Sequence, residues 1–230
     1  MNKAGQLVCA HSAWVVAILM GLGIFVIAGW MPLIEPGMSS ADLAAHFEQN
    51  RMRIRLGMSV LALAVVFWWP FSAAIAMQMK RVEGESHPFT YVQMGAASGS
   101  AITLLLAAYC WLVAAYRPET PPSTIQMLND FSWFMFVSAY PPIFIQSIAI
   151  GFCILMDSNP VKAYPRWVGF AAIWSAILFV PGALVPFFFS GPFAWNGLIA
   201  FWLVATIFFG WIFVMWWNTV KAIKSDPRLN

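Results

Sequence analysis

The sequence predicts an all-α integral membrane protein, one domain over residues 1–230 built as a bundle of six transmembrane helices. Six apolar stretches carry no charge in their middle, and each exceeds the roughly 20 residues that a helix needs to cross a bilayer. The chain is 61% hydrophobic and only 9% charged, far below the roughly 25% charged residues of a soluble domain. Because hydrocarbon offers no water to satisfy backbone amides, such stretches are expected to be helices.

The expected spans are separated by short connections that leave no room for a soluble domain. In chain order they cover about residues 8–31, 56–79, 91–116, 131–156, 167–189 and 196–218. The first span follows Lys3, but no small-residue cleavage site comes after it, so we expect an uncleaved helix.

The longest connection, about residues 32–55, joins the first two spans. Its segment 39–42 (SSAD) is typical of a helix start. Apolar side chains then recur near helical spacing at Leu43, Phe47, Ile54 and Met58. We therefore expect a short surface helix that runs directly into the second span.

The third span carries a row of small residues, Gly95, Gly99 and Thr103. A row of this kind lets a second helix approach closely, so we expect Gly95 and Gly99 to face a neighbouring helix, either within the chain or in a partner protomer. The segment 95–99 (GAASG) is one residue too long for the serine motif of an intramembrane protease. The later spans also lack a histidine base.

Prolines interrupt three spans, which we expect to be kinked. They are Pro70, Pro141, Pro142, Pro181 and Pro186. Carbonyls freed by proline need protein or water around them, and several kinks at similar depth are compatible with an outward-facing cavity. The expected aromatic walls of that cavity are Trp68, Trp69, Tyr109, Trp111, Trp133 and Tyr140.

The distribution of basic residues predicts the orientation. Eight Lys and Arg residues would share the side of both termini, and the other four, Arg51, Arg53, Arg55 and Arg117, would lie on the far side. By the positive-inside rule, we expect a multi-pass protein of the cell (cytoplasmic) membrane with both termini in the cytoplasm. The connection 187–196 has no charge, so we expect it at headgroup depth or dipping into the protein.

The sequence gives no signature of catalysis, and it predicts no metal site and no cofactor. None of the three histidines lies mid-membrane, no lysine lies within a span, and the three cysteines are far apart. A net charge of +3 is too small to indicate nucleic acid as a partner. The expected partners are membrane lipid, a hydrophobic small molecule, and further copies of the chain or other membrane subunits.

The fourth span is unusual because polar and aromatic side chains share one of its faces. Asn129, Trp133 and Tyr140 recur at helical spacing, and Gln146 lies beside them near the inner end. Such a ridge either forms hydrogen bonds between helices or binds a ligand. Asp130 would cap its helix, pair with Arg117 or another outer arginine, or recognise a ligand. The candidate ligand-binding residues are Asn129, Asp130, Trp133, Tyr140, Gln146, Tyr109 and Arg117.

Three classes of function remain open from the sequence. The first is a protein that binds or passes a hydrophobic or weakly polar small molecule through an outward-facing aromatic cavity. The second is a structural or scaffolding subunit of a larger membrane complex. The third is a membrane enzyme that acts on an apolar substrate through a lone acid such as Asp130.

Overall fold

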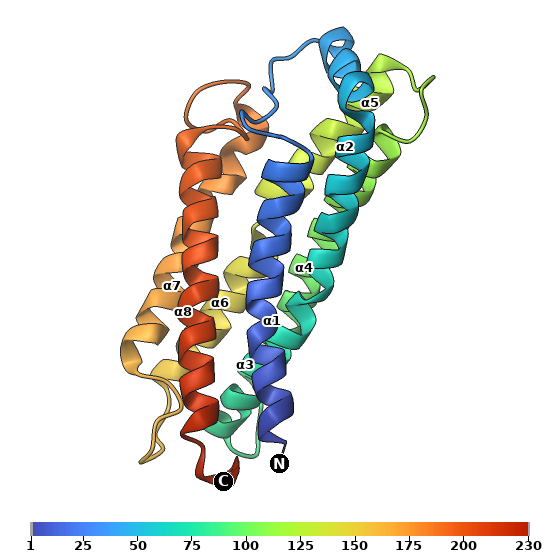
Figure 1. The fold of residues 1–230 in the computed structure, drawn as a ribbon. Coiled ribbons are helices and arrows are strands. Elements are labelled where there is room, and N and C mark those ends of the chain that lie inside the picture. The colour runs from blue at the N-terminus through green and yellow to red at the C-terminus, as the bar shows by residue number, and fades with distance from the viewer. Residues whose placement is uncertain (1, 230) are drawn as a thin grey trace.

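A computed structural model describes residues 2–229 as a bundle of helices, and no strand occurs within that range (Figure 1). Six helical segments are long and apolar enough to cross a membrane. In chain order they are Lys3–Ile27, Ser40–Glu83, Pro88–Ala114, Pro122–Leu155, Arg166–Phe187 and Leu198–Lys224. The expected all-α bundle of six spanning helices is confirmed, and the chain is a multi-pass membrane protein.

Only the third segment, α4 (Pro88–Ala114), is one uninterrupted α-helix. The first comprises α1 (Lys3–Gly21) and a π-helical turn, η1 (Leu22–Ile27), and the second comprises α2 (Ser40–Val66) and α3 (Trp68–Glu83). The fourth comprises α5 (Pro122–Trp133), a π-helical turn, η2 (Phe134–Ser138), and α6 (Pro141–Leu155). The fifth comprises α7 (Arg166–Phe179) and a 3₁₀ segment, η3 (Val180–Phe187). The sixth comprises a π-helical turn, η4 (Leu198–Leu203), and α8 (Val204–Lys224), and a 3₁₀ turn, η5 (Pro227–Leu229), follows it.

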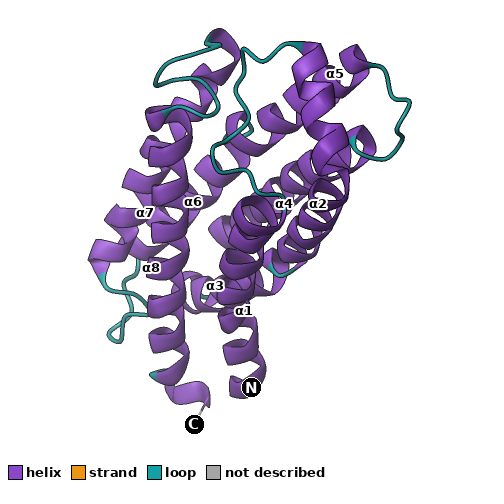
Figure 2. Ribbon diagram, turned by 45° about the horizontal axis from the view of Figure 1, so that its top comes forward, coloured by secondary structure: helices purple, strands orange, loops and turns teal. Residues whose placement is uncertain are grey.

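Both chain termini lie at the same end of the bundle, which we call the proximal end (Figure 1). The opposite, distal end carries the loops 28–39, 115–121 and 188–197. Figure 2 shows that the long loops gather at these two ends. The interior between the ends is therefore formed by helix packed on helix.

The expected helix start at residues 39–42 is confirmed. The Ser39 hydroxyl oxygen accepts a hydrogen bond from the backbone N–H of Asp42 at 3.2 Å, and it donates to the Asp42 carboxylate at 2.6 Å. This capping fixes the first turn of α2, where the N–H groups have no partner within the helix. From there α2 runs without interruption into the second span.

The α-helical pattern changes close to several prolines. Helix α2 ends at Val66, four residues before Pro70, which has no N–H to donate to the Val66 carbonyl. In the fourth segment, η2 ends at Ser138, three residues before Pro141. In the fifth, α7 gives way to a 3₁₀ segment immediately before Pro181.

Small residues allow close contact between three pairs of segments. Gly23 of η1 lies against the backbone of Gly57 in α2, and Gly151 of α6 lies against that of Gly169 in α7. A Cβ placed on Gly99 of α4 would lie 3.2 Å from Pro142 Cβ, so Gly99 faces α6 as expected. Gly95 faces no helix of its own chain, so for this glycine contact with a partner protomer stays a prediction. This glycine is exposed and nothing lies within 4 Å of a Cβ there, because it lies on the outer side of α4.

Candidate functional site

A cavity of about 100 Å³ lies in the bundle, from the middle of α4 to the distal halves of the first and sixth segments. Five of the six spanning segments line it, and the second segment does not. Apart from Ser100, Thr103 and Tyr140, every lining residue is apolar, and none carries a charge. A mainly apolar cavity with a few polar groups has the usual composition of a small-molecule site.

The three π-helical turns meet at this cavity. Ile24 and Phe25 of η1, Phe136 of η2, and Ala200 and Phe201 of η4 all contribute to its lining. A π-helical turn interrupts the regular i to i−4 hydrogen bonding and is frequent at functional sites. Its occurrence in three separate segments around one cavity distinguishes this region from the rest of the bundle.

Arg53 of α2 fixes the distal end of η1. Its guanidinium donates to the backbone carbonyls of Ile27 at 3.1 Å and Val26 at 3.3 Å. These carbonyls end a helical segment, where the last C=O groups have no helical partner. Gly29 follows with a φ of +72°, and a side chain there would collide with the Arg53 guanidinium. Arg53 therefore binds backbone in this structure, although it was among the expected partners of Asp130.

Four buried tryptophans form a cluster on the distal side of the cavity. The tryptophan cluster consists of Trp30, Trp111, Trp133 and Trp195. The ring centroids of Trp30 and Trp111 are 4.8 Å apart, those of Trp111 and Trp133 are 5.1 Å apart, and Trp133 stacks on Trp195 at 5.9 Å. Trp133 also contacts Phe201, which lines the cavity, at 6.2 Å. The tryptophan cluster therefore forms the distal wall behind the cavity lining.

The indole N–H groups of this cluster are only partly satisfied. Trp111 donates to the Asn129 side-chain oxygen at 3.2 Å, and Trp195 donates to the backbone carbonyl of Ile34 at 2.8 Å. The N–H groups of Trp30 and Trp133 are buried without a partner among the described residues. In the uncharged connection 187–196, Ala194 and Trp195 are buried against the protein, whereas residues 187–192 are exposed.

The structure brings three of the expected site residues into this region. Asn129 and Trp133 belong to or contact the tryptophan cluster, and Tyr140 lines the cavity. Asp130 is half-buried next to Asn129, whose side-chain amide is 3.5 Å from its carboxylate. Gln146 is fully buried on α6, one turn from the lining residue Ile143.

Two expected site residues lie apart from the cavity. Tyr109 is 54% exposed on the outer surface of α4. Arg117 is exposed in the loop 115–121, where it lies 3.8 Å from Glu119 and over the ring of Tyr116. Among the described residues, Asp130 forms no ion pair with Arg117, because the arginine side chain turns to partners within its own loop.

Buried polar groups without partners continue from the cavity toward the proximal end. They are the hydroxyls of Ser72, Ser100 and Ser147, the side-chain oxygen of Gln93, and both amide atoms of Gln146. These residues belong to α3, α4 and α6, which pack against one another. Leaving such a group without a hydrogen bond costs about 2–7 kcal/mol. Burying Gln146, whose two amide atoms both lack a partner, therefore costs a large amount of free energy.

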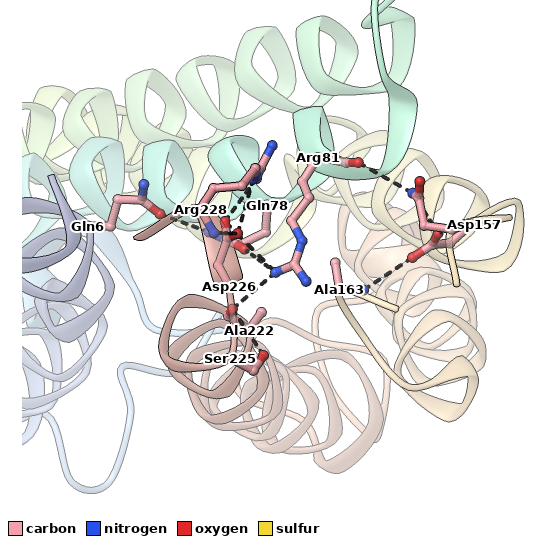
Figure 3. Close-up of polar contacts among 10 residues, drawn as sticks. Gln6, Gln78, Arg81, Asp157, Ala163, Ala222, Ser225, Asp226 and Arg228 are labelled. Carbon is pink, nitrogen blue, oxygen red and sulfur yellow. Dashed lines mark hydrogen bonds and ion pairs between the residues drawn. The ribbon is translucent and has the colours of Figure 1, made fainter. Parts of the chain in front are cut away.

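A second polar region lies at the proximal end, where side chains from several segments form hydrogen bonds and ion pairs with one another (Figure 3). The Arg81 guanidinium of α3 donates to the Ala222 carbonyl at 3.1 Å and to Gln78 at 3.4 Å, and it lies 4.0 Å from the Asp226 carboxylate. Asp226 also accepts two side-chain hydrogen bonds from Arg228, at 3.0 and 2.8 Å. These contacts join α3 to the end of α8 and the tail after it.

The same region includes α1 and the loop 156–165. Gln78 donates to Gln6 of α1 at 2.8 Å. Asn159 donates to the Asp157 carboxylate at 2.9 Å and to the Arg81 carbonyl at 3.4 Å, and the Ala163 N–H donates to Asp157 at 3.2 Å. We call the side chains of Gln6, Gln78, Arg81, Asp157, Asn159, Asp226 and Arg228 the proximal network. Because its members bond to one another, the proximal network is a structural connection between α1, α3, the loop 156–165 and the tail after α8.

Within residues 2–229, no group of three or more His, Cys, Asp or Glu side chains is arranged to hold a metal ion. No family model matches the chain, and no curated protein or solved structure matches it either. The candidate site must therefore be interpreted from its geometry. It is the uncharged cavity, with three π-helical turns around it, three hydroxyls in its lining and the tryptophan cluster on its distal side.

Proposed function

We propose that the protein binds an uncharged hydrophobic or weakly polar small molecule in this cavity, within the membrane. The observation that supports the proposal is a cavity lined by apolar and aromatic side chains at the meeting point of three π-helical turns. Prolines near η2 and η3 keep the backbone there from regular α-helix, which favours a kinked, locally open bundle.

The proposal includes an orientation in which the cavity faces outward from the cell membrane. The proximal end carries the larger share of Lys and Arg residues and would be cytoplasmic by the positive-inside rule. Cysteine labelling in whole cells tests this orientation. A cysteine in place of Glu119, at the distal end, should react with an impermeant reagent, and one in place of Lys162, at the proximal end, should not. The reverse pattern would refute the orientation.

Occupancy of the cavity can be tested with an apolar probe that quenches tryptophan fluorescence. In nanodiscs, 1-bromo-4-methylnaphthalene should quench saturably, because bromine in the cavity lies near the tryptophan cluster. Ala205→Phe fills the cavity lining, and the saturable quenching should disappear. Thr206→Phe, one residue along α8 and exposed, adds a similar side chain outside the cavity and should leave quenching unchanged.

The same experiment separates binding from partitioning into lipid. Partitioning gives quenching that rises without saturation and is equal in all three proteins, and that result would refute the proposal. Native mass spectrometry of the purified protein provides an independent measurement. A small molecule that co-purifies with the unsubstituted protein and not with Ala205→Phe supports the proposal, whereas a stoichiometric partner chain without a small molecule supports a structural subunit.

A further inference from the structure

The three hydroxyls of the cavity lie on one wall. Ser100 and Thr103 are one turn apart on α4, and both line the cavity. Gly99 is in contact with Pro142 at the start of α6, and Tyr140, two residues earlier, also lines the cavity. The contact between α4 and α6 therefore places all three hydroxyls at the same side of an otherwise apolar space.

These hydroxyls retain unused hydrogen-bonding capacity. Ser100 is 6% exposed, and its oxygen has no partner among the described residues. Thr103 donates its proton to the Ser100 carbonyl at 2.9 Å, which leaves the Thr103 oxygen free to accept. Tyr140 makes no hydrogen bond through its phenol within residues 2–229, and its ring packs at right angles to Phe144. The wall thus offers two donors and several acceptors.

The charge of the lining restricts the ligand further. No lining residue is acidic or basic. A charged ligand would lose its hydration in this apolar space without gaining an opposite charge, which is strongly unfavourable. A pure hydrocarbon would leave the buried Ser100 hydroxyl without a partner, as it is in the free protein, and so would gain no free energy from that group. The chemistry that matches both conditions is a neutral molecule with an apolar body and one hydrogen-bonding group.

Building on the proposed function, we infer that the ligand is an uncharged amphipathic molecule with a hydroxyl or carbonyl head. Its head bonds to Ser100 and Tyr140 on the wall between α4 and α6. Its apolar body packs on the opposite wall, against Phe201 and Phe208. In this arrangement the Ser100 hydroxyl gains the partner that the protein does not supply.

A pair of probes that differ only in the head group tests this assignment. In nanodiscs, 4-bromo-1-naphthol carries a hydroxyl where 1-bromo-4-methylnaphthalene carries a methyl group of similar size. The unsubstituted protein should bind the naphthol about tenfold more tightly, which corresponds to about 1.4 kcal/mol, within the range of one net hydrogen bond. Ser100→Ala and Tyr140→Phe should each remove most of that preference and leave the affinity for the methyl analogue unchanged.

A matched control uses a hydroxyl that is already satisfied. Ser175 of α7 donates to the Ala171 carbonyl at 2.8 Å and does not line the cavity, so Ser175→Ala should keep the preference for the naphthol. If both probes bind saturably with equal affinity, the cavity binds ligands but the head-group assignment is wrong. If Ser100→Ala weakens both probes equally, shape and not hydrogen bonding is responsible, which also overturns it. If neither probe binds saturably, the proposed function itself fails.

Discussion

Replacing Asp226 with Asn should destabilise the proximal end of the protein. The side chain of Asp226 is 1% exposed and lies between two arginines, Arg81 and Arg228. The substitution keeps the shape and one accepting oxygen, so the hydrogen bond from the Arg228 backbone N–H, at 3.0 Å, can remain. What it removes is the negative charge that both guanidinium groups face.

The two arginines contribute unequally to the expected loss. The Arg228 side chain is 50% exposed, so water replaces much of its interaction and the cost is below about 1 kcal/mol. Arg81 is only 8% exposed, and a buried charge left without its partner costs about 3–5 kcal/mol. Because Arg81 lies 4.0 Å from Asp226 and keeps its bonds to Ala222 and Gln78, its share falls below that range. We expect a total of about 2 kcal/mol.

The dependence on pH distinguishes loss of charge from loss of packing. Hydrogen bonds from the Arg228 side chain hold the pKa of Asp226 below its usual value of 3.8. A carboxyl whose pKa is lowered by folding stabilises the protein at pH values above the unfolded pKa. That stabilisation is lost as the pH falls through the lower, folded pKa. The difference in stability between the two proteins should therefore be full above about pH 4 and shrink below it.

Equilibrium unfolding in mixed detergent micelles, followed by tryptophan fluorescence between pH 3 and pH 7, measures both effects. Glu85→Gln provides the matched control, because Glu85 is exposed at the same end of the bundle and should change stability by less than about 0.5 kcal/mol. Equal stability of Asp226→Asn and the unsubstituted protein at pH 7 would refute the reasoning. A loss that stays constant as the pH falls would show that packing, and not charge, is responsible.

Two further predictions concern helix contact and surface charge. Gly99→Leu should lower stability by about 1–3 kcal/mol because its side chain collides with Pro142, whereas Gly95→Leu, in open space on the same helix, should be nearly neutral in a thermal unfolding assay. Equal effects would show that α4 and α6 do not pack as described. Arg117→Gln should change stability by less than about 0.5 kcal/mol, and its effect should add to that of Asp130→Asn in a double-mutant cycle, since the two side chains are not paired.

The spans were predictable because membrane crossing depends on a property of contiguous residues. An apolar run must be long enough for a helix to cross the bilayer, and each of the six runs reaches that length. Local chemistry also predicted the start of α2, where Ser39 caps its own helix. The row of small residues on α4 was predicted less well. Gly95 and Gly99 are equivalent in sequence, and only the tilt of α6 across α4 decides which of them is covered.

The candidate site was predictable only where its signal lies within one span. The polar and aromatic ridge of the fourth span identified Asn129, Trp133 and Tyr140, but their partners Trp30 and Trp195 come from distant segments. The three π-helical turns leave no signal in apolar sequences such as that of η1, since hydrophobic periodicity does not reveal one extra residue in a turn. This is why the cavity lining from η1 and η4 was not anticipated.

The proximal network was missed for a related reason. Arg81 and Asp226 are 145 residues apart in the sequence, and no local pattern links them. Their pairing depends on α3 and α8 ending at the same level, which only the assembled bundle shows. The nearest sequence signal is the spacing of Asp226 and Arg228, which suits a local ion pair but does not indicate a third partner.

The proximal network also makes the bundle mechanically asymmetric. It ties α1, α3 and α8 together at one end, whereas the cavity lies toward the other. The sixth segment has 27 residues and is therefore about 40 Å long. If this segment tilts by about 5° about the proximal network, its distal end moves by roughly 3.5 Å. The same tilt displaces the proximal end far less, because the displacement grows with distance from the pivot, so the cavity end of the bundle is the one that a small tilt changes.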